Sequence, residues 1–261
     1  MTQASNDPIP TDAAYRRLPE TMRAAIGRNY GGPEQVATET LPRPEPGTGE
    51  VLIRVGAAGL DRATLHLLTG LPYVARLALG LRRPRRPVLG QQVAGEVVAV
   101  GGGDVPYAVG ERVFGTAASG SFAEYAVASP KRLAPTPAGV SDVDAATIGV
   151  SGVTGREAVL RGGQLQAGQR VLVLGASGAV GSFAVQVASG LGAEVTGVCS
   201  DAKLEFVRTL GAQHVADYRS TSLADLGGGF DLIVDIGGNR RVSQLRAALT
   251  PTGRLVIVGG E

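Results

Sequence analysis

The spacing of apolar and polar residues changes near residue 150. Before that point, short apolar runs such as Glu50–Val55, Gln92–Val100 and Arg112–Phe114 alternate with turns rich in Gly and Pro. Short apolar runs bounded by turn residues predict β-strands. Residues 22–150 are therefore expected to form a β-rich domain. Residues 1–21 are polar and aperiodic, and we interpret them as a flexible leader.

Beyond Ser151, near-continuous apolar runs alternate with helical patterns. The expected strands are Arg170–Leu174, Glu194–Cys199, His214–Asp217, Asp231–Asp235 and Arg254–Val258, and the expected helices are Ala179–Leu191, Asp201–Leu210 and Arg240–Leu249. Such alternation is typical of a parallel sheet that helices cover on both faces. Residues 151–261 therefore predict an α/β domain with a doubly wound parallel sheet of five strands.

Composition and charge narrow the class of protein. Of 261 residues, 44% are hydrophobic and 18% charged, which suits a well-packed core, and a net charge of +2 gives no general reason to bind nucleic acid. No apolar run reaches the roughly 18 residues of a membrane span, and the N-terminus carries no apolar signal segment. The single Cys excludes a disulfide framework. We expect a cytoplasmic protein with neither nucleic acid nor membrane as a partner.

A glycine-rich turn after the expected strand Arg170–Leu174 is the strongest local signal. Gly175 can make a tight turn, Gly178 lets backbone amides approach a pyrophosphate, and Gly181 lets the following helix pack closely on the sheet. The helix N-terminus would present free N–H groups to the phosphates. The candidate cofactor residues of this turn are Gly175, Ser177, Gly178, Ala179, Val180 and Gly181. The alternative is a glycine-rich turn that binds no ligand.

The end of the second strand indicates which nicotinamide cofactor the turn would bind. A site for NAD usually has a carboxylate there, which binds the ribose 2′-hydroxyl. Here the strand ends in Cys199 and Ser200, and Lys203 follows closely. A hydroxyl and an ammonium suit a 2′-phosphate, so we predict NADPH as the cofactor. Asp201 could take the role of the carboxylate and leaves NADH as the less favoured alternative.

Further blocks of sequence accompany the glycine turn. They are Gly168-Gln169, Leu172, Ala176-Ser177-Gly178, Gly181, Gln186 and Ser189, together with Pro87–Gly101, Val109–Phe114, Gly120–Tyr125 and Ile148–Thr154. This pattern resembles the medium-chain dehydrogenase/reductase superfamily, specifically its zinc-free quinone oxidoreductase (zeta-crystallin-like) branch, and departs from it at Ala179, where that family usually has glycine. The resemblance extends from about Met22 to the last residue. It implies a GroES-like β-barrel domain followed by a Rossmann domain, with the active site in the cleft between them.

The sequence differs from this superfamily at two places. Where the zinc alcohol dehydrogenases have a Cys and a Gly-His-Glu segment, this chain has Leu60-Asp61 and Gly90-Gln91-Gln92, so we expect no zinc and no other metal. Family Rossmann domains have six strands, whereas this sequence stops after the fifth, so we expect a truncated chain with the sixth strand missing. A homodimer is possible, but the missing strand would weaken it and leave an apolar sheet edge exposed.

The resemblance also implies a reaction and residues for it. The expected function is zinc-independent transfer of a hydride from NADPH to a quinone or an α,β-unsaturated carbonyl. Asp61 and Thr64 take the places of an Asn and an Asp that line the nicotinamide end in the family, and are the candidate catalytic residues. The alternative for Asp61 is a helix N-cap. The other candidate cofactor contacts are Thr154 at the nicotinamide, Ser200, Lys203 and Tyr218 near the adenosine phosphate, and Gly237 and Gly259 after the fourth and fifth strands.

Three alternatives remain open at this stage. The chain could be a zinc-free NADP-dependent alcohol or aldehyde oxidoreductase, or a nucleotide-binding protein without turnover. The basic stretch Arg82–Arg86 is interpreted as a solvated loop, with binding of a phosphate or an acidic membrane as the alternative.

Overall fold

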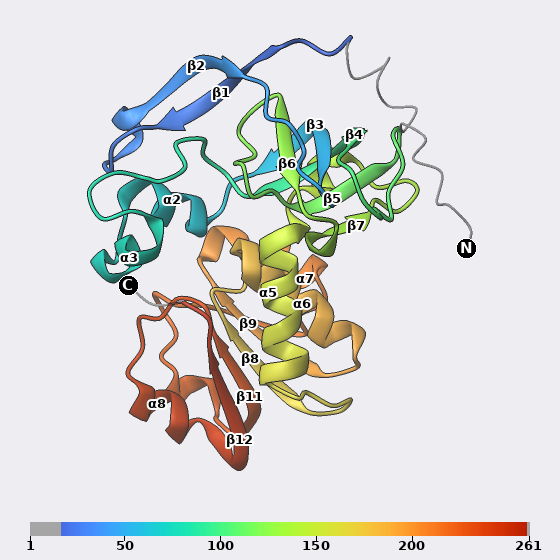
Figure 1. The fold of residues 1–261 in the computed structure, drawn as a ribbon. Helices are drawn as coiled ribbons and strands as arrows, with labels where there is room; N and C mark the ends of the chain where they lie inside the picture. The colour runs from blue at the N-terminus through green and yellow to red at the C-terminus, as the bar shows by residue number, and fades with distance from the viewer. Residues whose placement is uncertain (1–16, 260–261) are drawn as a thin grey trace, which may run out of the picture. The chain divides into compact units, whose positions relative to one another are not determined.

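The computed structural model describes residues 17–259, which fold into two compact units (Figure 1). One unit ends at Val150 and the other begins at Ser151. Of the leader expected over residues 1–21, residues 1–16 lie outside the described part of the chain. The remainder belongs to the first unit, because Leu18 packs against its hydrophobic core and Thr21 begins its first strand. The fold therefore starts upstream of the expected Met22.

The first unit is built on a five-stranded antiparallel sheet with the strand order β6-β3-β4-β5-β7. Its strands are β3 (Val51–Gly59), β4 (Gln92–Val100), β5 (Arg112–Thr116), β6 (Tyr125–Ala128) and β7 (Leu133–Pro135). β-Branched side chains suit such a pleated surface, and Val51, Ile53, Val93, Val97 and Val113 form its fully buried core. The β-rich first unit is confirmed.

A second, two-stranded sheet pairs β1 (Thr21–Gly27) with β2 (Val36–Pro42). Along β1, Met22, Ala24 and Ile26 are buried, and the residues before each of Met22 and Ala24 are exposed. Because burial alternates with a period of two residues, one face of β1 faces the core of the unit.

Short helices complete the first unit. They are α2 (Arg62–Thr69), α3 (Arg76–Leu79) and α4 (Asp142–Ala145), with 3-10 turns at Pro33–Gln35, Tyr73–Ala75 and Pro130–Arg132. Helix α2 has clear sequence boundaries: the Asp61 side chain caps its first turn, and Gly70 ends it with a φ of +65°. This left-handed conformation favours glycine.

The second unit is an α/β fold around a five-stranded parallel sheet with the order β10-β9-β8-β11-β12. The strands are β8 (Arg170–Leu174), β9 (Glu194–Cys199), β10 (His214–Asp217), β11 (Phe230–Asp235) and β12 (Leu249–Ile257). The helices are α5 (Val153–Glu157), α6 (Ala179–Gly190), α7 (Leu204–Thr209) and α8 (Val242–Ala247), with a π-helical turn at Ala158–Gly162 and 3-10 turns at Asp201–Lys203 and Ala224–Leu226. Another π-helical turn, Ile148–Gly152, spans the boundary between the two units.

Alternate residues of the central strand β8 face opposite sides of this sheet. Val171 and Val173 share a core with Ala184 of α6, whereas Leu172 shares another with Leu245 of α8. Helices therefore cover both faces, as the continuous apolar runs predict, and the doubly wound architecture is confirmed. The order of the strands is that of a dinucleotide-binding fold. No helix among residues 17–259 is both long and apolar enough to cross a membrane.

Candidate cofactor and substrate sites

The glycine turn between β8 and α6 has the backbone geometry that its sequence predicts. Gly175 has a φ of +85°, which L side chains rarely adopt. Its N–H and that of Ala176 donate to the Val198 carbonyl at 3.0 and 2.9 Å, and the Gly178 N–H donates to the Gly175 carbonyl at 3.0 Å. A Cβ on Gly181 would overlap that same Gly175 oxygen. The tight turn and the close helix packing both depend on glycine.

The N-terminus of α6 carries unused backbone donors. Gly178 is the N-cap, and no side chain caps the helix. Within the described chain, the N–H groups of Ala179, Val180 and Gly181 form no backbone hydrogen bond. Ser177, partly buried, completes the turn. Free donors and the positive end of a helix dipole at one point can bind an anion such as a phosphate.

The carboxyl ends of all five parallel strands lie at the same edge of the sheet. Ser200 follows β9 and Tyr218 follows β10, and the Tyr218 N–H donates to the Cys199 carbonyl at 3.1 Å. On the other side of the glycine turn, Gly237 follows β11 and Gly259 follows β12. The structure thus brings these predicted residues to one sheet edge with Gly175, where open α/β sheets bind their ligands.

Two cations stand at the β9–β10 part of this edge. Lys203 ends the 3-10 turn after Ser200, and its N–H donates to the Ser200 carbonyl at 2.9 Å. Arg219 directly follows Tyr218, with its guanidinium carbon 5.4 Å from the centre of the tyrosine ring. Both side chains are exposed, as is the carboxylate of Asp201. The sequence interpretation missed Arg219, although a basic residue directly after the third strand is a signal that could have found it.

Cys199, the last residue of β9, is buried with 3% of its surface exposed. Burial raises the pKa of the thiol, the nearby Asp217 carboxylate raises it further, and Lys203 opposes these effects. The thiol therefore stays protonated at neutral pH.

Thr154 lies on α5, close to the beginning of α6. The next residue, Gly155, packs against α6 so tightly that a Cβ there would lie 2.8 Å from the Val180 carbonyl and 3.0 Å from the Ala184 nitrogen. Thr154 is partly buried. Its contact with the nicotinamide stays a prediction.

In the first unit, Asp61 and Thr64 contact each other. One carboxylate oxygen of Asp61 accepts from the Thr64 N–H at 2.8 Å and from its hydroxyl at 2.9 Å. Thr64 is 4% exposed. The N-cap interpretation of Asp61 is confirmed, and the catalytic role of the pair stays a prediction.

Gln92 extends this pair into a buried network that sequence reasoning missed. Its amide nitrogen donates to the second Asp61 oxygen at 3.0 Å, and its amide oxygen accepts from the Val150 N–H at 2.8 Å. The side chain is 1% exposed. Gln92 thus joins β4, the start of α2 and the last residue of the first unit.

The donor set around Asp61 does not fit zinc. Zinc sites in proteins use Cys, His and carboxylate ligands in a tetrahedral set. Of Leu60-Asp61 and Gly90-Gln91-Gln92, the segments that the resemblance places at the zinc of the alcohol dehydrogenases, only Asp61 supplies such a group. Across residues 17–259, no three His, Cys, Asp or Glu side chains are grouped closely enough to hold a metal ion.

Known proteins share both units of this chain. Residues 47–138 match the family "Alcohol dehydrogenase GroES-like domain", and residues 179–261 match the family "Zinc-binding dehydrogenase". The human quinone oxidoreductase is 31% identical over 250 residues, which cover 92% of this chain and 74% of that protein. A trans-enoyl reductase of Aspergillus terreus is 34% identical over 227 residues, covering 82% of this chain and 61% of that protein.

Two further comparisons concern a longer protein and a bound cofactor. A mycocerosic acid synthase-like polyketide synthase of Mycolicibacterium smegmatis is 31% identical over 228 residues, which are 84% of this chain but 10% of the synthase. A mycobacterial protein solved in complex with NADPH has a TM-score of 0.80 and 28% identity, over 92% of this chain and 74% of the other. The chain therefore spans a tenth of the synthase and about three quarters of the human quinone oxidoreductase.

Proposed function

This chain belongs to the medium-chain dehydrogenase/reductase superfamily, in the branch of the quinone oxidoreductases, and on that premise we propose that it is an NADPH-dependent oxidoreductase. The proposed acceptor is a quinone or an α,β-unsaturated carbonyl, reduced without zinc. The observation that carries the proposal is the sheet edge where the glycine turn, Ser200, Lys203 and Tyr218 meet.

The chain's own residues divide the binding of the cofactor among them. The free N–H groups of Ala179, Val180 and Gly181 would hold the pyrophosphate. Gly237 and Gly259 follow the neighbouring strands and would leave space for the cofactor along the edge. Thr154, on the helix beside α6, would orient the nicotinamide. When bound, NADPH supplies the hydride.

The choice of NADPH over NADH rests on charge. Lys203 and Arg219 bring two cations to the ends of β9 and β10 near Ser200, where the carboxylates are those of Asp201 and Asp217. The Asp217 carboxylate is already engaged by the Arg219 N–H at 3.1 Å. A phosphate with a charge near −2 gains charge-assisted hydrogen bonds from such a set, whereas a ribose hydroxyl gains little. The Tyr218 ring beside Arg219 would flank the adenosine.

The proposed acceptors need no metal at the reacting oxygen. In a quinone or an enone, the charge that develops on hydride addition delocalises onto an oxygen that hydrogen-bond donors can stabilise. The Thr64 hydroxyl donates its hydrogen bond to Asp61, whose carboxylate also accepts from the Gln92 amide, so these polar groups are engaged with one another. We therefore assign this pair a positioning role: it fixes the start of α2 and the loop after β3.

The first test is a thermal-shift titration of the whole chain with NADPH and NADH. A ligand that binds only the folded state raises the melting temperature by mass action. We expect the melting temperature to rise at a far lower concentration of NADPH than of NADH. Lys203→Ala and Arg219→Ala each remove one charge-assisted contact, which should weaken the binding of NADPH about tenfold and leave the binding of NADH unchanged. Lys131→Ala, which removes the chain's other, exposed lysine, is the matched control.

Turnover is measured separately, as loss of NADPH absorbance with naphthoquinone or cyclohexenone as acceptor. Oxidation with either acceptor, unaffected by a metal chelator, supports the proposal. Tight NADPH binding without oxidation across both acceptor classes would contradict it and favour a nucleotide-binding protein without turnover. Equal shifts with NADPH and NADH in all variants would contradict the assignment of Lys203 and Arg219.

A further inference from the structure

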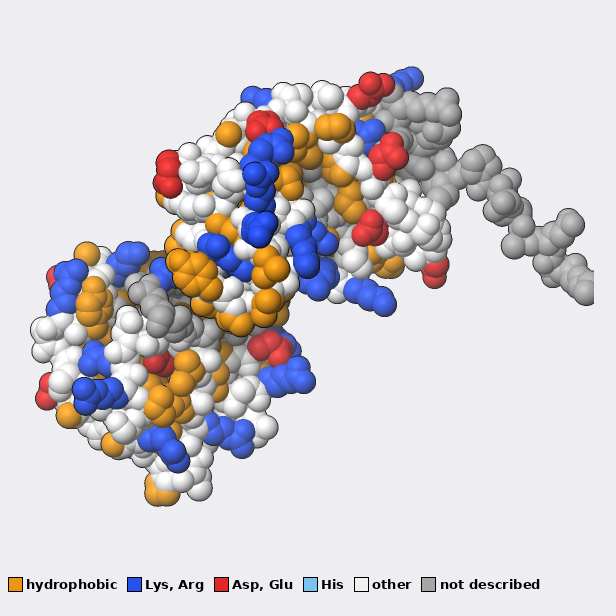
Figure 2. Space-filling model, turned by 60° about the vertical axis from the view of Figure 1, so that its left-hand side comes forward, with side chains coloured by type: hydrophobic (Ala, Val, Ile, Leu, Met, Phe, Trp, Pro, Cys, Tyr) orange, Lys and Arg blue, Asp and Glu red, His pale blue; other side chains and the backbone are white. Residues whose placement is uncertain are grey.

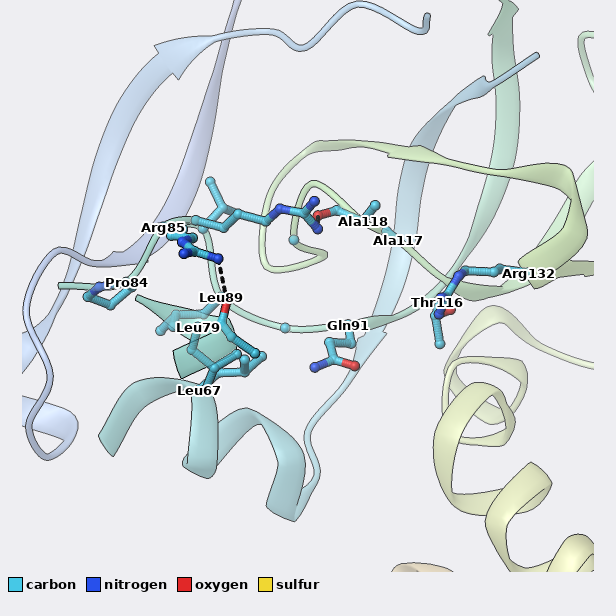
Figure 3. A pocket seen from close by; sticks show the side chains of 15 residues that line it. Leu67, Leu79, Pro84, Arg85, Leu89, Gln91, Thr116, Ala117, Ala118 and Arg132 are labelled. Atoms are coloured by element: carbon cyan, nitrogen blue, oxygen red, sulfur yellow. Dashed lines mark hydrogen bonds between the residues drawn. The ribbon is translucent and has the colours of Figure 1, made fainter. Parts of the chain in front are cut away.

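The first unit contains a cavity of about 540 Å³ whose lining combines apolar and cationic side chains (Figure 3). Leu67, Leu79, Val88 and Leu89 supply apolar walls. The size is within the range of pockets that bind small organic ligands. Gln91 also lines the cavity, directly beside the buried Gln92 of the Asp61 network.

Three arginines line this cavity: Arg85 and Arg86 from the loop before β4, and Arg132 from the 3-10 turn before β7. None of the residues that line the cavity is acidic. Within residues 17–259, none of the three arginines forms an ion pair. The cavity therefore carries positive charge that no described carboxylate neutralises.

Two of the guanidinium groups are held in place by backbone oxygens. Arg85 donates to the Ala78 carbonyl at 3.0 Å, drawn as a dashed line in Figure 3, and Arg86 donates to the Ala118 carbonyl at 2.6 Å. A guanidinium has five N–H donors, so each group keeps donors for a ligand. Held donors lose less conformational entropy on binding than mobile ones.

The basic surface continues outside the cavity. From Arg62 to Gly95 the sequence contains no Asp or Glu. Tyr73, Leu77 and Leu81, from the same stretch, are each about 70% exposed. Figure 2 shows hydrophobic side chains next to a group of Lys and Arg side chains on the surface. An approaching molecule thus meets apolar contact area and positive charge together, as it does inside the cavity.

We propose that this cavity binds the anionic end of an amphipathic ligand, an apolar molecule that carries a carboxylate or a phosphate. Charge-assisted hydrogen bonds from Arg85, Arg86 and Arg132 would hold the anion, and the leucine walls would hold the hydrocarbon. If the ligand is the substrate, an acidic quinone or enone, the proposal rests on the proposed function. The binding of an amphipathic anion in the cavity does not depend on that function.

The test uses ligands that cannot be reduced, so that it does not depend on turnover. Binding of decanoate, decyl phosphate and decanol to the whole chain is measured by isothermal titration calorimetry without nucleotide. We expect decanoate or decyl phosphate to bind at least tenfold more tightly than decanol, and the tighter of the two identifies the anion. Arg132→Gln and Arg85→Gln each remove one charge-assisted contact, which should lower the affinity for that anion about tenfold. Arg132→Lys should retain most of the affinity.

Arg83→Gln is the matched control, because Arg83 is exposed in the same basic stretch but does not line the cavity. Circular dichroism melts confirm that each variant folds. Equal binding of decanol and the anions, no binding of any of the three, or an equal loss in Arg83→Gln and Arg132→Gln would overturn the proposal. Anion binding without NADPH oxidation would overturn the proposed function and leave this site in place.

Discussion

Replacing Gly181 by Ala should destabilise the second unit, although alanine is the better helix former. A Cβ at this position would overlap the Gly175 carbonyl oxygen and lie 2.9 Å from the Ala176 Cα. Carbon atoms pack at about 3.5–4.0 Å, so clearing the Ala176 Cα alone would require α6 to withdraw from the turn by roughly 0.6–1 Å, and clearing the Gly175 oxygen requires more. Both neighbours are backbone atoms and cannot rotate away as a side chain could.

The magnitude follows from two opposing effects. Overpacking of this kind costs about 1–3 kcal/mol, and the helix propensity of alanine recovers up to about 1 kcal/mol. Gly190→Ala, at the other end of α6, is the matched control, because a Cβ there meets nothing within 4 Å. It should stabilise the unit by about 0.4–1 kcal/mol. The two substitutions make the same chemical change in one helix and should shift stability in opposite directions.

Calorimetric melting of both variants beside the unchanged chain measures the effect. For a unit of this size, 1 kcal/mol corresponds to about 4–8 °C in Tm. We expect a lower Tm for Gly181→Ala and a higher one for Gly190→Ala. Because the withdrawal of α6 also moves the free N–H groups, Gly181→Ala should bind NADPH more weakly as well. Equal Tm values for the two variants would refute the close-packing role of Gly181.

Three further predictions concern the first unit. Gln92→Leu should lower the free energy of unfolding in urea by about 1–3 kcal/mol, because both the Asp61 carboxylate and the Val150 N–H lose their buried hydrogen-bond partner. Gln91→Leu, at a position whose side chain forms no such bonds, should cost less. Asp61→Ala should cost about 0.5–2 kcal/mol by loss of the α2 cap, and Asp61→Asn should restore most of that stability; equal losses in both would contradict the capping role. Hydrogen bonds from the backbone N–H and the guanidinium of Arg23 lower the pKa of Glu124, so its stabilisation is present above its unfolded pKa of about 4.3 and lost as the pH falls through the lower folded value. Thermal melts of Glu124→Gln should therefore differ from those of the unchanged chain at pH 7 and converge with them in acid, and a constant difference would contradict the assignment.

The second unit could be predicted well because its three central strands, β8, β9 and β11, are mostly apolar and almost entirely buried. Strands β8, β9 and β10 begin and end at the predicted residues. The prediction failed where the pairing of strands determines the boundary of an element. The helix expected over Arg240–Leu249 ends at Ala247, because Leu249 pairs with Phe230 as the first residue of β12. Helical periodicity cannot detect a strand partner that is distant in sequence.

The candidate site divides in the same way. The glycine turn is local in sequence, so its strand–turn–helix pattern could be recognised directly. The network around Gln92 joins residues that are 31 and 58 positions away from it, and a glutamine in a strand pattern gives no sign of such partners. Arg219 is intermediate, because its neighbour Tyr218 was identified while the cation beside it was not.

The burial of Cys199 has a chemical consequence under the proposed function, in which the acceptor is a quinone or an enone. These compounds are soft electrophiles, and thiolates add to them to form covalent adducts. This chain has one cysteine, and it is both shielded from solvent and held protonated by its surroundings. With the proposed acceptors, the chain would present no reactive sulfur to its substrate, so adduct formation at cysteine would not limit the number of turnovers that each molecule completes.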